Sequence, residues 1–258
     1  MKPQLLYYDL GARATAFSTT RQGGCSIGNY AGMNINPYCG DTAEHVSANR
    51  ILLADELGIP AEHVFLPHQV HNIDAVTIYE PFLDQPFHFQ QQHLEGIDAL
   101  MTNVKGVCIG VSTADCIPLI VYSPHSHAAA VIHAGWRGTV QRIASHVVTV
   151  FCKRFGAPFD SVRVIIGPGI SQKNFEVGDE VYDAFDCHGF DMEQIAIRQE
   201  KWHIDLPLCN RLQLEELGIP SSNIHDCGIC TYDHSGQFFS ARRLGIDSGR
   251  IYTGIILR

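Results

Sequence analysis

Three strand-length apolar runs in the middle of the chain constrain its fold more than any other feature. They span residues 107–112, 118–122 and 128–134, and only short turns separate them. Runs that are apolar at nearly every position are typical of strands covered on both faces. Because no helix lies between them, the pattern departs from the regular strand–helix alternation of α/β folds. It favours mixed sheets instead.

Two helices are predicted from their end signals and apolar spacing. Residues 41–57 form the first, because Asp41 or Thr42 can cap its start and Gly58 can end it. The second follows Gly135 and carries an apolar stripe at helical spacing, formed by Trp136, Val140, Ile143, Val147 and Phe151. This stripe predicts an amphipathic helix that packs on a sheet.

The rest of the chain adds further strands, one more helix and a loop. The strands are predicted at residues 12–19, 64–78 and 162–166. Asp205 and Gly218 frame the helix, and the polar stretch 86–96 is predicted to be a surface loop. No internal repeat or low-complexity linker divides the chain. We therefore expect an α+β fold, a single-domain layered sandwich of mixed β-sheets flanked by helices over residues 1–258.

Composition excludes several classes of protein. Hydrophobic residues make up 45% of the 258 residues and charged residues 17%, so the chain is not disordered in bulk. The 18 basic and 27 acidic side chains give a formal charge of −9. An acidic surface repels phosphate backbones, so we expect no nucleic-acid partner.

Neither a targeting segment nor a membrane span is visible in the sequence. The first residues lack the apolar core of a signal peptide, and the longest apolar runs are far shorter than the ~20 residues that cross a bilayer. The nine cysteines are scattered and odd in number, as expected of reduced thiols. We therefore expect a soluble cytoplasmic protein with no membrane partner.

Three polar segments lie at strand ends, where a scaffold presents reactive groups. They are residues 68–71, 112–116 and 133–138, and they contain His71, Cys116 and His133. Thiolate and imidazole are ligands that zinc prefers, and three protein ligands are typical of a catalytic site. The spacing is unlike that of a zinc finger, so the fold would have to assemble the site. By themselves, these side chains could equally be packing residues.

The same residues allow two other chemistries. Cys116 as nucleophile with His133 as base would make a cysteine hydrolase or acyltransferase. Two histidines and a cysteine also suit copper. A multicopper laccase carries several His-x-His pairs, whereas this chain has one, formed by His125 and His127. Copper electron transfer is therefore the weaker hypothesis.

Other side chains are candidates for anion binding and proton transfer. Arg21 beside two glycines, Arg137 at a helix start, and Arg243 in an arginine pair could each bind phosphate. Glu176 and Asp115 are the carboxylates considered for proton transfer. For each of these residues, an ordinary surface or ion-paired role is the alternative.

Together the motifs resemble those of one family, the YfiH proteins, also called the laccase-domain or multicopper polyphenol oxidase family. The matching segments run through nearly the whole chain: residues 17–24, 33–36, 69–71, 98–100, 113–116, 133–138, 166–168, 175–178, 230–232 and 238–243. One departure is Ala241, where relatives often have an aromatic residue. So many spaced motifs make the resemblance highly specific.

The resemblance implies a metal site on His71, Cys116 and His133, with zinc as the metal and copper as the alternative. It also implies purine nucleoside phosphorylase activity, in which phosphate cleaves adenosine or inosine to ribose 1-phosphate and free base. Methylthioadenosine cleavage and adenosine deamination have been attributed to such proteins, the polyphenol oxidase label persists, and some relatives are linked to peptidoglycan editing. The expected partners are thus purine nucleosides and phosphate, for a monomer or small homo-oligomer.

Roles for individual residues follow as hypotheses. In deamination, Glu176 or Asp115 would carry protons. In phosphorolysis, Arg21 and Arg243 would clamp the phosphate. Asn34, which lies in one of the shared motifs, is predicted to contact the substrate.

Overall fold

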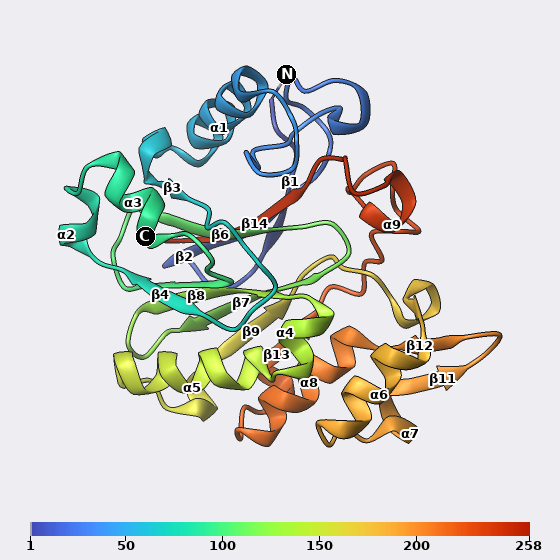
Figure 1. The fold of residues 1–258 in the computed structure, drawn as a ribbon. Helices are drawn as coiled ribbons and strands as arrows, with labels where there is room; N and C mark the ends of the chain where they lie inside the picture. Colours follow the sequence, from blue (N-terminus) through green and yellow to red (C-terminus); the bar gives the residue numbers. More distant parts are fainter. Residues whose placement is uncertain (1) are drawn as a thin grey trace.

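Two large mixed sheets and one small antiparallel sheet make up the strands of the computed structural model, which describes residues 2–258 (Figure 1). The first sheet pairs its strands in the order β1-β2-β14-β6-β3. All neighbours are antiparallel except β6 and β3. The bounds are β1 Leu5–Tyr8, β2 Ala14–Thr19, β14 Ile251–Leu257, β6 Cys108–Thr113 and β3 Val64–Phe65.

The second sheet contains two of the three apolar runs that the sequence marks as strands covered on both faces, residues 118–122 and 128–134, whereas the run 107–112 forms β6 of the first sheet. Its order is β13-β9-β7-β8-β5-β4, with parallel pairs only at its two edges. The bounds are β13 Ile224–Asp226, β9 Arg163–Ile166, β7 Ile117–Ser123, β8 Ala128–Ala134, β5 Ala99–Thr102 and β4 Ala75–Ile78. The small sheet consists of β10 Glu176–Val177, β12 Trp202–Ile204 and β11 Ala196–Arg198. The predicted α+β class with mixed sheets is confirmed.

Helices cover the outer faces and the edges of these sheets (Figure 1). They are α1 Ala43–Leu57, α2 Glu80–Leu83, α3 Phe87–His93, α4 Trp136–Val140, α5 Ile143–Phe155, α6 Asp179–Cys187, α7 Met192–Ile195, α8 Leu206–Glu216 and α9 Ala241–Leu244. No helix within residues 2–258 is both long enough and apolar enough to cross a membrane.

Strand β7 shows how the layers are built, because its side chains alternate between two cores. Leu119 and Val121 pack with α5 and α8 on the outer side of the second sheet. Ile120 and Tyr122 point the other way, into the core between the two large sheets. A further core covers the outer face of the first sheet, where α1 packs. The molecule is therefore layered as α1, first sheet, second sheet, then α5 with α8.

The ends of α1 agree with the prediction from sequence. Thr42 is the N-cap, and its side chain accepts a hydrogen bond from the backbone N–H of His45. Gly58 ends the helix with φ of 66°, a left-handed conformation that glycine adopts without a steric penalty.

The predicted helix after Gly135 is broken in two, which the apolar stripe did not reveal. Arg142 has φ of 61° and separates α4 from α5. Gln213 of α8 spans the break, since its Nε2 donates to Thr139 O at 3.1 Å and its Oε1 accepts from Ser145 N at 3.4 Å. A side chain from another helix thus bridges the break, in addition to the backbone hydrogen bond from Arg142 N to Thr139 O at 3.0 Å.

The polar stretch 86–96 was predicted to be a loop, and this prediction is wrong. Most of it forms α3, whose Gln90 side chain donates to the backbone carbonyls of Phe82, Leu83 and Gln85. These contacts tie α3 to the preceding turn, and the sequence pattern contains no sign of them.

Candidate metal centre and cavity

The three predicted ligands, His71, Cys116 and His133, come together at one end of the second sheet. Their ligand atoms all lie within 4.8 Å of one another. His71 is exposed, Cys116 is partly buried and His133 is buried. The two imidazole rings meet edge to face with their centroids 4.7 Å apart. This group could hold a metal ion.

Strand pairing explains why residues so distant in the chain meet. Strands β7 and β8 are antiparallel with Pro118 opposite His133, so Cys116, just before β7, lies beside that histidine. On its other side β8 pairs with β5. There the backbone N–H of His133 donates to Asp98 O at 2.8 Å, which places Asp98 against the site.

The carboxylate of Asp98 connects two of the three ligands. Asp98 is fully buried, and its Oδ1 accepts hydrogen bonds from His133 Nδ1 at 2.7 Å and from the His71 backbone N–H at 3.0 Å. Its Oδ2 accepts from the backbone N–H groups of Val70 at 3.2 Å and Asn72 at 2.8 Å. The bond to Nδ1 leaves Nε2 of His133 as the ligand atom, as in zinc sites where a carboxylate orients the histidine.

Two residues of the site have left-handed backbone conformations. His71 has φ of 65° and Asp115 has φ of 88°. Such conformations cost about 1–3 kcal/mol for residues with a Cβ, and they concentrate at functional sites. The Asp98 carboxylate holds His71 in this conformation by accepting a hydrogen bond from its backbone N–H. The second is anchored by the Asp115 carboxylate itself, which accepts from Thr231 Oγ1 and from the Arg242 backbone N–H, each at 2.6 Å.

The electrostatics of the cluster favour a thiolate. Desolvation raises the pKa of the Cys116 thiol, but charge and hydrogen-bond interactions with His133 and His71 outweigh it and bring that pKa below its usual value. Burial lowers the pKa of His133, but the Cys116 charge and the Asp98 hydrogen bond outweigh it and raise that pKa. The thiolate is the form that binds metals.

Gly135 packs closely against two of the ligands. A Cβ added to Gly135 would lie 2.8 Å from His71 Cδ2 and 3.2 Å from Cys116 Sγ, so a larger residue would push into both ligands. One thiolate and two imidazoles form a donor set suited to zinc, with a fourth position left for a substrate or water. The residues present therefore fit a catalytic type of zinc site.

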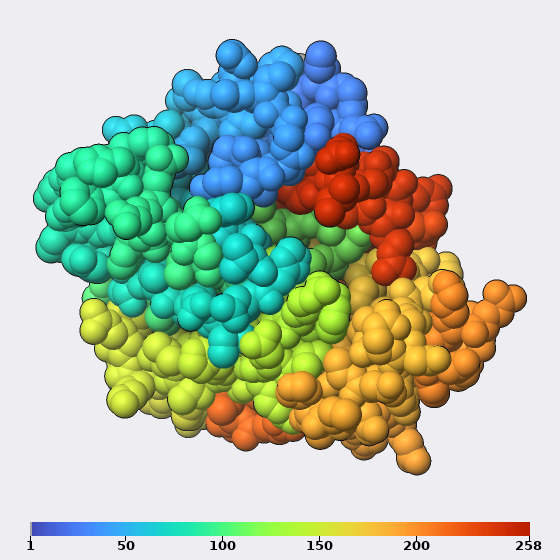
Figure 2. All heavy atoms as spheres, in the orientation of Figure 1, coloured from blue at the N-terminus to red at the C-terminus, as the bar shows by residue number. Residues whose placement is uncertain are grey.

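The cluster lies in a cavity of about 630 Å³, within the ~300–1,000 Å³ typical of small-molecule sites. Figure 2 shows this hollow between the blue and cyan segments and the red C-terminal segment, with green residues at its floor. Most of the lining residues carry polar side chains, and the lining comprises Asn36, Tyr38, Cys39, Gly40, His68, Gln69, His71, Ser112, Thr113, Ala114, Cys116, His133, Ala241, Ile246, Asp247 and Arg250.

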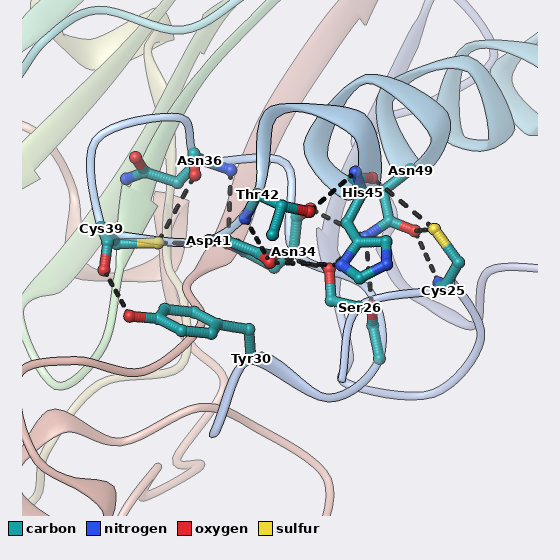
Figure 3. A network of polar contacts seen from close by, with 11 residues as sticks. Cys25, Ser26, Tyr30, Asn34, Asn36, Cys39, Asp41, Thr42, His45 and Asn49 are labelled. Atoms are coloured by element: carbon teal, nitrogen blue, oxygen red, sulfur yellow. Dashed lines mark hydrogen bonds and ion pairs between the residues drawn. The ribbon is translucent and has the colours of Figure 1, made fainter. Parts of the chain in front are cut away.

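One wall of the cavity comes from the loop before α1, which a polar network holds in place (Figure 3). Asp41 Oδ2 accepts hydrogen bonds from Ser26 Oγ at 2.6 Å and from Asn34 Nδ2 at 2.8 Å. From α1, Asn49 Nδ2 donates to Ser26 Oγ at 2.9 Å and to Asn34 O at 2.9 Å. This network fixes the segment that presents Asn36 to the cavity.

Neither carboxylate predicted to transfer protons lines the cavity. Both Asp115 oxygens are occupied by the hydrogen bonds described above, so this residue anchors the turn that presents Cys116. Glu176 on β10 lies half-exposed and 2.8 Å from Lys201 Nζ. The hydrogen bond from Lys201 lowers the pKa of Glu176. Proton transfer by these two groups stays a prediction.

The predicted phosphate and substrate residues also lie outside the cavity lining. Arg21 Nη1 donates to Ser235 O at 2.7 Å, and its guanidinium lies over the ring of Phe239. Arg243 is exposed and lies over the ring of Tyr232. Asn34 is fully buried in the wall network, as described above. The roles assigned to Arg21, Arg243 and Asn34 stay predictions.

Sequence reasoning missed several residues that build the site. Asp98 was noted only as part of a motif, although a carboxylate directly before an apolar strand signals a buried acid that needs donors. Gln69 pairs with the backbone of Ser112, accepting from its N–H at 2.7 Å and donating to its carbonyl at 2.8 Å. Arg250 is the one arginine or lysine among the lining residues of the described chain.

The fold and site define a class of α+β protein with a His–Cys–His cluster in a cavity between its segments. The family model described as multi-copper polyphenol oxidoreductase laccase matches residues 15–258. The chain therefore belongs to this family.

Two curated relatives and one solved structure are similar over most of their lengths. A purine nucleoside phosphorylase of Bacteroides thetaiotaomicron is 48% identical, covering 93% of this chain and 90% of that protein. Adenosine deaminase RL5, from an unknown prokaryotic organism, is 43% identical and covers 93% and 92%. The crystal structure of the Bacillus licheniformis protein YfiH has a TM-score of 0.92 at 27% identity, covering 99% of this chain and 97% of that one. The expected YfiH-like fold is thereby confirmed.

Proposed function

We propose that this protein is a zinc-dependent purine nucleoside phosphorylase that cleaves adenosine or inosine with phosphate to ribose 1-phosphate and free base. The observation that carries the proposal is the His–Cys–His cluster in a cavity large enough for a nucleoside. Similarity to a purine nucleoside phosphorylase along 93% of the chain supports the same reaction. The partners are then purine nucleosides and phosphate, with methylthioadenosine as a further candidate substrate.

Zinc is favoured over copper for two reasons. The donor set of one thiolate and two imidazoles, with a fourth position left open, is typical of catalytic zinc. Within residues 2–258, this is also the one group of histidine, cysteine and acidic residues that could hold a metal, whereas a multicopper oxidase needs several copper sites. The His-x-His pair lies at the opposite end of β8, where His127 contacts Tyr122. Polyphenol oxidation is therefore the weaker alternative.

The residues of the site have different roles in the proposed phosphorolysis. Zinc, when bound, supplies a Lewis acid. Asp98 keeps Nε2 of His133 directed at the ligand position. Arg250 places a fixed positive charge on the cavity wall, where it can attract phosphate.

An assay of product formation tests the proposed function. Purified protein with measured zinc content is incubated with inosine or adenosine, with and without phosphate, and the products are separated by chromatography. We expect free base and ribose 1-phosphate only when phosphate is present, and we expect both products to disappear when a chelator removes the zinc. Absence of base release by the zinc-loaded protein would refute the proposal.

Adenosine deamination is a second candidate because the relative named adenosine deaminase RL5 is 43% identical. The same assay separates the two reactions. Deamination converts adenosine to inosine and ammonia whether or not phosphate is present. A thiol hydrolase based on Cys116 is a third reading, and it predicts that alkylation of the thiol stops activity in metal-free protein.

Arg250 gives a prediction about phosphate binding. Its Nη2 donates to Ile246 O at 2.8 Å, and its backbone N–H donates to Asn34 Oδ1 at 3.1 Å, so the side chain is held at the cavity wall. Because hydrogen bonds to charged groups contribute about 1.5–3 kcal/mol, we expect Arg250→Gln to raise the KM for phosphate roughly 10–100-fold. Initial rates at varied phosphate measure this change.

Two further variants control for this result. Arg250→Lys keeps the charge and should recover part of the phosphate affinity. Arg21→Gln changes an arginine held away from the cavity by Ser235 and Phe239. If Arg21→Gln raises the phosphate KM and Arg250→Gln leaves it unchanged, phosphate binds where the sequence motifs predicted it.

A further inference from the structure

A third imidazole lines the cavity, three residues before the ligand His71 in the chain. His68 is part of the cavity wall, and its Nδ1 lies 2.6 Å from Glu95 Oε1. Backbone pairing brings the two residues together, because His68 N donates to Leu94 O at 2.9 Å and Gly96 N donates to His68 O at 3.0 Å. An isolated parallel β-bridge between the two backbones, rather than the chance position of two long side chains, therefore sets this pair.

The ring of His68 is held on two sides. Glu95 fixes the Nδ1 edge, and Tyr38 stacks on one face with ring centroids 4.2 Å apart and an interplanar angle of 22°. Among residues 2–258, the ring hydrogen-bonds through Nδ1 alone. Its Nε2 is therefore the nitrogen left for a molecule bound in the cavity.

A carboxylate at Nδ1 and a free Nε2 are the features of an acid–base histidine. The carboxylate holds the Nδ1 edge of the ring and so sets its orientation. Phosphorolysis needs such a group, because the departing purine carries away the electron pair of the broken bond. The other imidazoles of the cavity, His71 and His133, belong to the metal cluster. Neither is available to supply this proton.

We propose that His68 is the general acid of the reaction and donates the Nε2 proton to the leaving base, with Glu95 as its positioning partner. This inference rests on the proposed phosphorylase activity. A phosphate oxygen forms a bond to C1′ of the ribose as the bond from C1′ to N9 of the purine breaks. The electron pair of that bond enters the purine, and the proton of His68 moves to purine N7. His68 then regains a proton from solvent.

The test compares two substrates that differ in their need for a proton. Inosine needs protonation as its base leaves. The purine of 7-methylinosine already carries the positive charge, so it leaves as a neutral base. General acid catalysis contributes about 10²–10⁴-fold. We therefore expect His68→Asn to lower kcat for inosine at least ~100-fold, while kcat for 7-methylinosine stays close to that of the wild type.

Two variants keep the test independent of folding. Glu95→Gln retains a hydrogen-bond acceptor for Nδ1 but removes the charge, and it should lower kcat for inosine more than for 7-methylinosine. His225→Asn removes an exposed histidine on β13 and should change neither substrate. Zinc content and circular dichroism confirm that each variant is loaded and folded.

The outcomes separate this inference from the proposed function. If wild-type protein cleaves inosine but His68→Asn affects both substrates equally, or neither, His68 is not the general acid and the phosphorylase proposal stands. If zinc-loaded wild-type protein cleaves neither nucleoside, both proposals fall.

Discussion

Replacing Cys116 by alanine is expected to abolish stoichiometric zinc binding while leaving the protein folded. The sulfur is the one thiolate of the cluster, and both histidines interact with it directly. Loss of a ligand should weaken zinc binding by more than the ~10–100-fold that follows from losing a group that only orients a ligand. Nucleoside cleavage should fall with it. Metal analysis after dialysis and circular dichroism measure the two parts of this prediction.

The control for this variant is Cys187→Ala. Cys187 is exposed, lies at the end of α6 and is absent from the cavity lining. It should keep both zinc and activity. A Cys116→Ala protein that still binds one zinc per chain would show that the cluster is not the metal site.

The second large effect is expected for Asp98, where removal of one carboxylate disturbs two ligands at once. In Asp98→Ala, His133 Nδ1 and three backbone N–H groups lose their buried acceptor. Breaking a buried charged pair typically costs about 3–5 kcal/mol. We expect a loss of unfolding free energy of about that size, measured by denaturant titration.

Asp98→Asn separates metal binding from folding. It preserves the shape of the side chain but offers only one oxygen, so it must point an amide N–H₂ at existing donors. We expect zinc affinity to fall about 10–100-fold with a smaller loss of stability. Asp74→Asn is the matched control, because Asp74 is an exposed carboxylate one strand away whose side chain accepts from Asn72. Unchanged zinc affinity in Asp98→Asn would show that Asp98 acts on folding alone.

Much of the secondary structure follows from local sequence signals. Thr42 and Gly58 set the ends of α1 because capping and left-handed turns depend on residues within a few positions. The burial of β7 on both faces likewise follows from its apolar composition. By contrast, the break at Arg142 is bridged by Gln213 of another helix, and no periodicity argument within the broken helix could find this contact.

The sequence by itself determined which side chains could bind a metal or take part in a reaction. His71, Cys116 and His133 stand out because thiolate and imidazole at strand ends are chemically suited to a metal. Their convergence within 4.8 Å was decided only by the tertiary structure, through the pairing of β7, β8 and β5. The same holds for Asp98, and for His68 with Glu95. Contacts of this kind depend on strand register between segments far apart in the chain, and register follows from the packing of whole sheets rather than from neighbouring residues.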